Sequence, residues 1–244
     1  MAKHELVPAY TKEGKLTGYA TNKSWAHDEG IWHAGAHVWV IYLDKNNKVE
    51  VLMQHRSDDK EFGPNTLDVS AAGHVGITKE ATNKFLSLFK ELKEDDLFEL
   101  LAGNKNVTKK ELEEILKITR LEGEDPITSG IREFYEEIFD GKKAIDINKN
   151  DLKHLFTMPE IHNYKAKERK FNNYEHDYVY LVVVKEKFEN FDIQLEEVKG
   201  MKWIKLDELE DKINAYINKE NIDLFPHSLI YWKTLLKEFK SYEN

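Results

Sequence analysis

The alternation of apolar and polar residues divides the chain into β-rich stretches, a helical block and two closing helices. Residues 37–42 (HVWVIY) and 49–55 (VEVLMQH) are rich in β-branched and aromatic side chains. The polar run 44–48 (DKNNK) between them has the composition of a turn, so the three segments predict a β-hairpin. Residues 66–75 (TLDVSAAGHV) predict a short strand that runs into a glycine turn.

A different periodicity follows. From residue 79 to about 121, apolar residues recur every three to four positions among many Glu and Lys, which predicts amphipathic helices. We interpret this block as a helical insertion in a β-rich succession. Strand patterns return at residues 154–159, 178–186 and 201–206, and helical patterns close the chain at 206–217 and 228–242. The last helix is amphipathic and covers either the core of this chain or a partner subunit.

Composition narrows the class of protein. The chain has 244 residues, of which 41% are hydrophobic, so it can bury a substantial core. It has no cysteine, which excludes disulfides, thiolate zinc sites and thiol nucleophiles. A net charge of −9 without a basic block argues against binding of a nucleic acid polymer. No apolar run approaches the roughly 18–20 residues that span a bilayer, and the first residues do not resemble a signal peptide. We therefore expect a soluble, cytoplasmic protein.

The strongest chemical pattern lies in residues 124–139 (EDPITSGIREFYEEIF). Asp125 is a suitable N-cap and Pro126 suits the first helical position, so a helix is predicted to begin here. The apolar residues form one stripe, which we expect to be buried: Ile127, Ile131, Phe134, Tyr135 and Ile138. Three carboxylates, Glu133, Glu136 and Glu137, share another face that we expect to be exposed.

These carboxylates repel one another, and Arg132, four residues before Glu136, offsets the repulsion only locally. A hard divalent cation such as Mg²⁺ would relieve the conflict, because it prefers carboxylate oxygens together with water and substrate phosphate. The alternative is a solvated acidic helix face. Spacing alone leaves both interpretations open.

The spacing Glu-x7-Arg-Glu-apolar-x-Glu-Glu, which begins at Glu124, resembles the helical half of the Nudix box. The glycine that opens the box would be Gly73, which lies 51 positions before Glu124 instead of the usual six. The helical block at about 79–121 therefore resembles an insertion of about 45 residues inside the box loop. The chain departs from the box at Ile138-Phe139-Asp140, where a glycine is usual, and Glu80 competes with Glu124 as the partner of Gly73.

The flanking segments resemble the isopentenyl-diphosphate-isomerase-like branch of Nudix proteins. The similarity is carried by residues 27–57, 62–75, 173–176 (NYEH) and 196–209, and it extends over about residues 15–210 without the insertion. The catalytic cysteine of the isomerases directly precedes the Gly-His pair, where this chain has Ala72, so isomerase activity is not expected.

The same resemblance implies a metal bound through His and Glu. His33, His74 and Glu175 match that set, whereas Asn173 stands where a second acidic ligand is expected. Alternatively, His74 makes a hydrogen bond within its loop and His33 packs beside Trp32.

The resemblance implies an α+β fold, namely a Nudix α/β/α sandwich with a mixed β-sheet. We expect a single domain over 1–244, with its core at about 30–210 and a C-terminal helical extension at about 207–244. The implied activity is Mg²⁺- or Mn²⁺-dependent hydrolysis of the diphosphate bond in a nucleoside-diphosphate-linked or similar organic diphosphate. The alternatives are a non-catalytic sensor that binds such a diphosphate, and an isomerase-like enzyme that uses a different acid.

Carried over by position, the resemblance assigns roles to individual residues. The metal ligands would be Glu133, Glu136, Glu137 and the Gly73 carbonyl. The catalytic residues would be Glu133, Glu137, Arg132 and Glu175, with Glu133 and Glu175 as rival general bases.

The predicted substrate-binding residues are Arg56, Lys60, His33 and His74. Arg56 could instead form a surface salt bridge with Asp58 or Asp59. Several aromatic residues either stack on substrate or belong to the core: Trp32, Trp39, Phe171 and Tyr174. For the inserted helices we predict a lid or a homodimer interface.

Overall fold

The computed structural model describes residues 5–60, 62–78, 80–81, 123–142, 145–166, 169–220 and 223–243. The predicted helical insertion at about 79–121, with its proposed role as lid or dimer interface, lies almost entirely outside the described residues. The chain divides into two units. We call Ala36–Gly73, Gly130–Met158 and Tyr178–Asn244 the sheet unit, and Met1–Gly35, His74–Ser129 and Pro159–Asp177 the N-terminal unit.

The sheet unit contains residues from all seven strands of the sheet found in the described part of the chain. These strands are β3 (His33–Leu43), β4 (Val49–Arg56), β5 (Leu67–Asp68), β6 (Ala71–His74), β7 (Leu152–Ala166), β8 (Arg169–Val184) and β9 (Val198–Lys205). Their order is β5-β4-β3-β8-β7, with β6 beside β3 and β9 beside β4. The antiparallel register of Val40 with Leu52 confirms the predicted hairpin. Both β7, which follows a short 3₁₀ turn at Lys149–Asp151, and β8 are longer than predicted.

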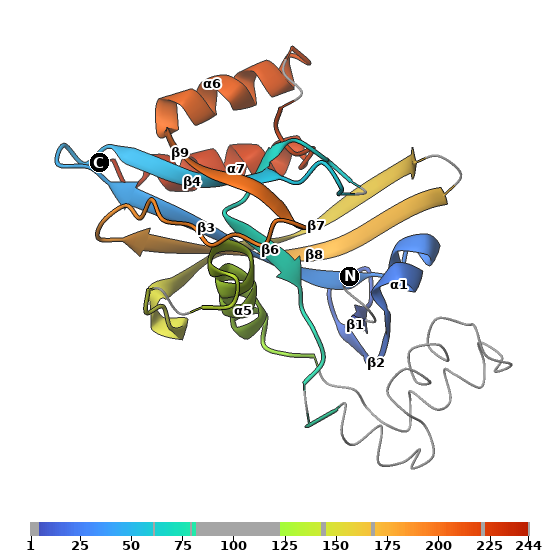
Figure 1. The fold of residues 1–244 in the computed structure, drawn as a ribbon. Coiled ribbons are helices and arrows are strands. Elements are labelled where there is room, and N and C mark those ends of the chain that lie inside the picture. The colour runs from blue at the N-terminus through green and yellow to red at the C-terminus, as the bar shows by residue number, and fades with distance from the viewer. Residues whose placement is uncertain are drawn as a thin grey trace, which may run out of the picture. The chain divides into compact units, whose positions relative to one another are not determined.

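Helices cover both faces of the sheet in this unit (Figure 1). Helices α6 (Leu206–Ile217) and α7 (Leu229–Lys240) lie on one face, and α5 (Pro126–Phe139) lies on the other. The alternation of side chains along β3 explains these layers. The Trp39 ring contacts Trp232 and Phe239 of α7, whereas Val38 lies against Gly130 of α5. The predicted α+β class and α/β/α sandwich are confirmed.

Helix α7 belongs to the core of its own chain. Four of its side chains are buried: Tyr231, Trp232, Leu235 and Phe239. They form one cluster with strand residues such as Trp39 and Ile41. The sequence left open whether this helix covers the core or a partner subunit, and the burial shows that it covers the core. Ile230, by contrast, is 69% exposed.

The N-terminal unit contains three elements that the sequence analysis did not predict. Strands β1 (Leu6–Tyr10) and β2 (Leu16–Asn22) form an antiparallel pair, and α1 (Lys23–Glu29) follows directly. Asn22 caps α1 by accepting the Ser24 amide at 2.9 Å, and Gly30 ends it at a φ of 64°. None of the helices in the described ranges is long and apolar enough to cross a membrane.

Candidate functional site

The acidic helix begins as predicted. Helix α5 starts at Pro126, and the Asp125 carboxylate accepts the Ile127 amide at 3.3 Å. The Ser129 hydroxyl donates to the Glu124 carboxylate at 2.8 Å, so Glu124 is held at the first turn. Its rival Glu80 is exposed.

The three carboxylates of α5 differ in exposure, which corrects the prediction of one exposed acidic face. Glu133 and Glu137 are buried, with 9% and 4% of their surfaces exposed, whereas the Glu136 side chain is 45% exposed. The cause is β6, because Ala72 and Gly73 pack directly against the two buried glutamates. We call Arg132, Glu133, Glu136 and Glu137 the helix cluster.

Glu137 is held by the strands beneath the helix. Its Oε2 accepts the Ala72 amide at 2.8 Å and lies 3.5 Å from Nε2 of Gln54. Burial raises the pKa of Glu137, although Lys60, the Ala72 amide and Arg56 partly oppose this effect. Oε1 of Gln54 is buried and has no hydrogen-bond partner among the described residues. A buried anion beside an unsatisfied oxygen suits an added hard cation.

Glu133 and Gly73 are in such close contact that a side chain at position 73 would force the Glu133 side chain to move. A Cβ on Gly73 would lie 2.0 Å from Cδ of Glu133. Arg132 Nη1 donates to Glu133 Oε1 at 2.5 Å and to Glu136 Oε2 at 3.2 Å. The structure therefore brings together the helix cluster and Gly73; their role in binding a metal stays a prediction.

Arg56 makes several contacts within its own loop. Its guanidinium donates to the Phe62 and Gly63 carbonyls and pairs with Asp68 at 3.1 Å. The partner is thus Asp68 and not Asp58, which pairs with Lys199 at 2.8 Å.

Asp68 is the centre of this network. His227 Nε2 lies 3.0 Å from its second carboxylate oxygen. Burial alone would raise the pKa of Asp68, but His227 and Arg56 hold it well below its usual range. Lys60 forms an ion pair with Glu197. Binding of substrate by Arg56 and Lys60 stays a prediction.

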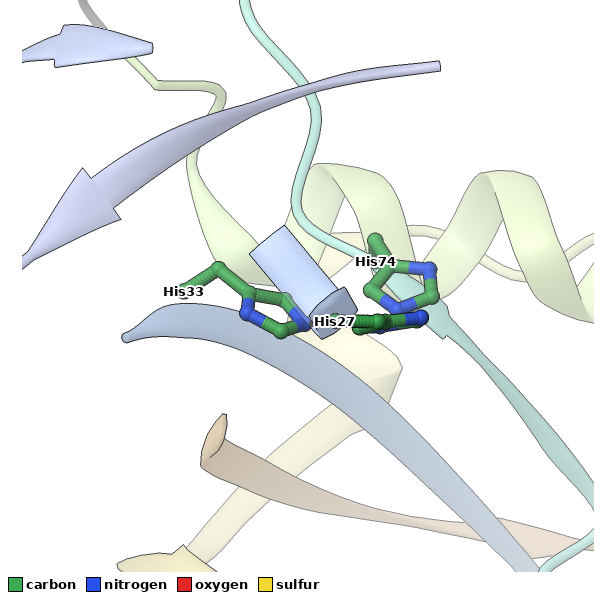
Figure 2. A group of neighbouring side chains, drawn as sticks. All are labelled: His27, His33 and His74. Carbon is green, nitrogen blue, oxygen red and sulfur yellow. Dashed lines mark hydrogen bonds between the residues drawn. The ribbon is translucent and has the colours of Figure 1, made fainter. Parts of the chain in front are cut away.

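A second cluster, of nitrogen ligands, lies in the N-terminal unit (Figure 2). The rings of His27, His33 and His74 gather so that one nitrogen of each lies within 4.8 Å of the others. The Nε2 atoms of His27 and His33 are 3.3 Å apart. Glu175 Oε1 lies 3.5 Å from His33 Nε2 and 3.3 Å from His74 Nε2. We call these four residues the histidine site.

Two imidazoles of the histidine site, those of His27 and His33, are neutral at pH 7. Burial lowers the pKa of His33 to about 4 and that of His27 to about 2. Neutral imidazoles and one carboxylate form a donor set that suits a transition metal or zinc. The helix cluster differs, because its possible ligands are carboxylate oxygens alone. Trp32, which the sequence analysis considered as a packing partner of His33, stacks on His176 with a centroid distance of 4.7 Å.

His27 is the member that the sequence analysis missed. It comes from α1, a short helix of seven residues whose pattern was too brief to be predicted. The available signal was its position six residues before His33 in a histidine-rich segment.

Comparison with known proteins shows what the chain is similar to. No family model matches the chain. The chain is similar to an uncharacterized Nudix hydrolase from Clostridium acetobutylicum, with 23% identity over 257 residues that cover 96% of both chains. Nudix hydrolase 3 of Arabidopsis thaliana is 23% identical over 227 residues, which cover 92% of this chain but 22% of that protein. A solved Nudix hydrolase from M. smegmatis has 10% identity and a TM-score of 0.45, covering 97% of this chain and 94% of that one.

Both curated relatives are named Nudix hydrolases, the class whose box the sequence of α5 resembles. Their names agree with the predicted enzyme class, a hydrolase that acts on diphosphate bonds.

Proposed function

We propose that this protein is a divalent-cation-dependent hydrolase that cleaves the diphosphate bond of a nucleoside-diphosphate-linked or similar organic diphosphate. The observation that carries the proposal is the burial of two adjacent-turn carboxylates, Glu133 and Glu137, against Gly73 and Ala72. Buried carboxylates are costly unless they are paired or coordinate a metal. Their retention in this arrangement favours a functional role over a solvated acidic face.

The helix cluster would hold Mg²⁺ or Mn²⁺ through Glu133, Glu136 and Glu137, together with the Gly73 carbonyl. A cation bound there neutralises negative charge on the bridging phosphate oxygens of a diphosphate. The Ala72 amide orients Glu137 through its hydrogen bond. Arg132 limits the repulsion between Glu133 and Glu136 by pairing with both.

Hydrolysis also needs a group that takes a proton from the attacking water. Glu133 and Glu175 remain the two candidates, and they differ in their surroundings. Glu133 pairs with Arg132, which favours the ionised form that a base needs. Glu175 lies between His33 and His74, so it serves equally well as a ligand.

The histidine site supports the finer assignment to the isopentenyl-diphosphate-isomerase-like branch. His33, His74 and Glu175, which that resemblance implies as ligands, lie together, and His27 joins them. We propose that these four residues bind a second divalent cation. With Ala72 before the Gly-His pair and no cysteine in the chain, thiol-dependent isomerisation is unavailable.

Incubation of the protein with Mg²⁺ or Mn²⁺ and a panel of diphosphates tests the activity. The panel contains nucleoside-diphosphate sugars, dinucleotides, nucleoside triphosphates, coenzyme A and prenyl diphosphates, with products identified by mass spectrometry. We expect cleavage of one class that is lost in Glu137→Gln and retained in Glu186→Gln, a control on an exposed residue of the sheet unit. Binding without cleavage across the panel would favour the sensor, and proton exchange on isopentenyl diphosphate in D₂O would favour the isomerase-like alternative.

A further inference from the structure

Glu5, at the start of the described chain, reaches the histidine site from outside the Nudix box. Its Oε1 lies 3.4 Å from Nδ1 of His74. Lys23 holds Glu5 in two ways: its ammonium lies 3.0 Å from Glu5 Oε2, and its amide donates to the Glu5 carbonyl at 2.9 Å. Glu5 therefore connects the start of β1 with the start of α1 beside His74.

The position of this carboxylate constrains the proton on His74. A neutral imidazole has one N–H group, and an ionised carboxylate can only accept a hydrogen bond. Both ring nitrogens of His74 face a carboxylate, because Nδ1 faces Glu5 and Nε2 faces Glu175. When a cation binds Nε2 together with Glu175, the proton of a neutral His74 ring therefore belongs on Nδ1, facing Glu5. The lone pair is then on Nε2, which lies 3.3 Å from Glu175 Oε1.

His33 is constrained in the same way. Its Nδ1 lies 2.8 Å from the Ile31 carbonyl, which also can only accept. Its lone pair is therefore on Nε2, 3.5 Å from the same Glu175 oxygen. Two imidazole lone pairs and one carboxylate oxygen thus converge, with Nε2 of His27 3.3 Å from Nε2 of His33, an arrangement that a cation stabilises.

We propose that Glu5 is a positioning residue of the histidine site, which keeps the His74 proton on Nδ1 so that Nε2 is directed at a divalent cation. Lys23 in turn orients Glu5. This inference rests on the proposed binding of a cation by His27, His33, His74 and Glu175. Carboxylates that accept from metal-bound imidazoles act in this way in many metal sites. It also gives a function to the residue directly before β1, which is Glu5, and to α1, which contributes Lys23 and His27.

The test compares Glu5→Ala and Glu5→Gln with Glu13→Ala, a control on an exposed residue in the turn between β1 and β2. Zn²⁺ serves as the diamagnetic probe, and long-range ¹H–¹⁵N spectra report the tautomer and metal ligation of each imidazole. Titration against a competing chelator gives the affinity. Thermal unfolding shows whether each variant is folded.

We expect Nδ1–H in the wild-type His74 ring and a mixture of tautomers in Glu5→Ala, with Zn²⁺ affinity about 10- to 100-fold weaker. Glu5→Gln should retain part of the affinity, because its amide oxygen still accepts the proton, and Glu13→Ala should match wild type. A merely structural role would not change the tautomer.

Two failures are distinguishable. If Zn²⁺ leaves the wild-type imidazole signals unchanged, the proposed cation site is wrong, and the tautomer of His74 in the metal-free protein still tests Glu5. If wild type binds Zn²⁺ and Glu5→Ala binds it equally well with the same tautomer, the role of Glu5 is refuted.

Discussion

Replacement of Gly73 by alanine is the sharpest test of the helix cluster. It adds a single methyl group to a residue whose carbonyl is a proposed metal ligand, and this methyl group points at Glu133. The Cβ would lie 2.0 Å from Cδ, 2.3 Å from Oε1 and 2.4 Å from Cγ of Glu133. No real contact is so short. Gly73 does not have a positive φ, so the requirement for glycine is steric and not conformational.

The displacement can be worked out from these distances. Cδ of Glu133 must retreat by about 1 Å before its distance from the new Cβ reaches even 3.0 Å, the lower limit for real contacts. A 1 Å misplacement in a catalytic arrangement costs about 100-fold in rate. Overpacking of this kind costs about 1–3 kcal/mol of stability, and here the flexible glutamate side chain takes up part of the strain. We therefore expect kcat/KM to fall about 100-fold while the protein remains folded.

The assay measures kcat/KM on the substrate that the diphosphate panel identifies, Mn²⁺ affinity by electron paramagnetic resonance, and urea unfolding. Gly200→Ala is the matched control, because Gly200 lies in the sheet unit and an added Cβ would meet nothing within 4 Å. Full activity and unchanged Mn²⁺ affinity in Gly73→Ala would refute the reasoning that the position of Glu133 beside Gly73 matters. A loss of equal size in Gly200→Ala would instead indicate a general effect on the sheet.

Three further predictions concern charge and packing in the sheet unit. Glu137→Gln removes a buried charge but leaves an acceptor for the Ala72 amide, so the melting temperature of the metal-free variant should equal or exceed that of wild type. Its turnover with metal should fall at least about 100-fold. A clear drop in melting temperature would contradict this prediction. Asp68→Asn leaves the half-buried Arg56 without its buried anion and should cost about 3–5 kcal/mol in urea unfolding at pH 7. Because the folded-state pKa of Asp68 lies below its unfolded value, its ion pairs stabilise fully above about pH 5 and are lost as the pH falls, so the difference between mutant and wild type should shrink toward pH 3. Trp232→Ala should cost about 3–5 kcal/mol by the same measurement, and a loss below about 1 kcal/mol would mean that α7 is not part of the core.

The regular elements of the sheet unit were predictable because each has a local signal. The hairpin of β3 and β4 combines apolar strands with a polar turn, and α5 has Asp125 and Pro126 at its start. The lengths of strands β7 and β8 were harder to predict than their presence. Polar residues such as Asn163 and Asn172 interrupt the patterns of β7 and β8, so only their apolar halves were recognised.

The exposure of the three glutamates on α5 could not be predicted from the sequence. Helical spacing shows which side chains share a face of the helix, but it does not show which other element packs against that face. Glu133 and Glu137 are buried by β6, a strand far earlier in the chain, and only tertiary structure brings Gly73 against Glu133. The same limit applies to Arg56. Sequence proximity suggested Asp58 or Asp59, but pairing of β4 with β5 supplies Asp68.

In the histidine site, the family resemblance identified some of the residues but not all of them. Residues inside the resembling segments, His33, His74 and Glu175, were identified correctly as neighbours. His27 was missed although it begins the resembling segment 27–57, because the short pattern of α1 carries no strong periodic signal. Glu5 lies outside the resembling segments, directly before β1. A buried imidazole must direct its proton at an acceptor and its lone pair at a donor or a metal. In the proposed site, Glu5 accepts from Nδ1 of His74 and leaves Nε2 for the cation, so the residues that complete such a site extend beyond the motif that reveals it.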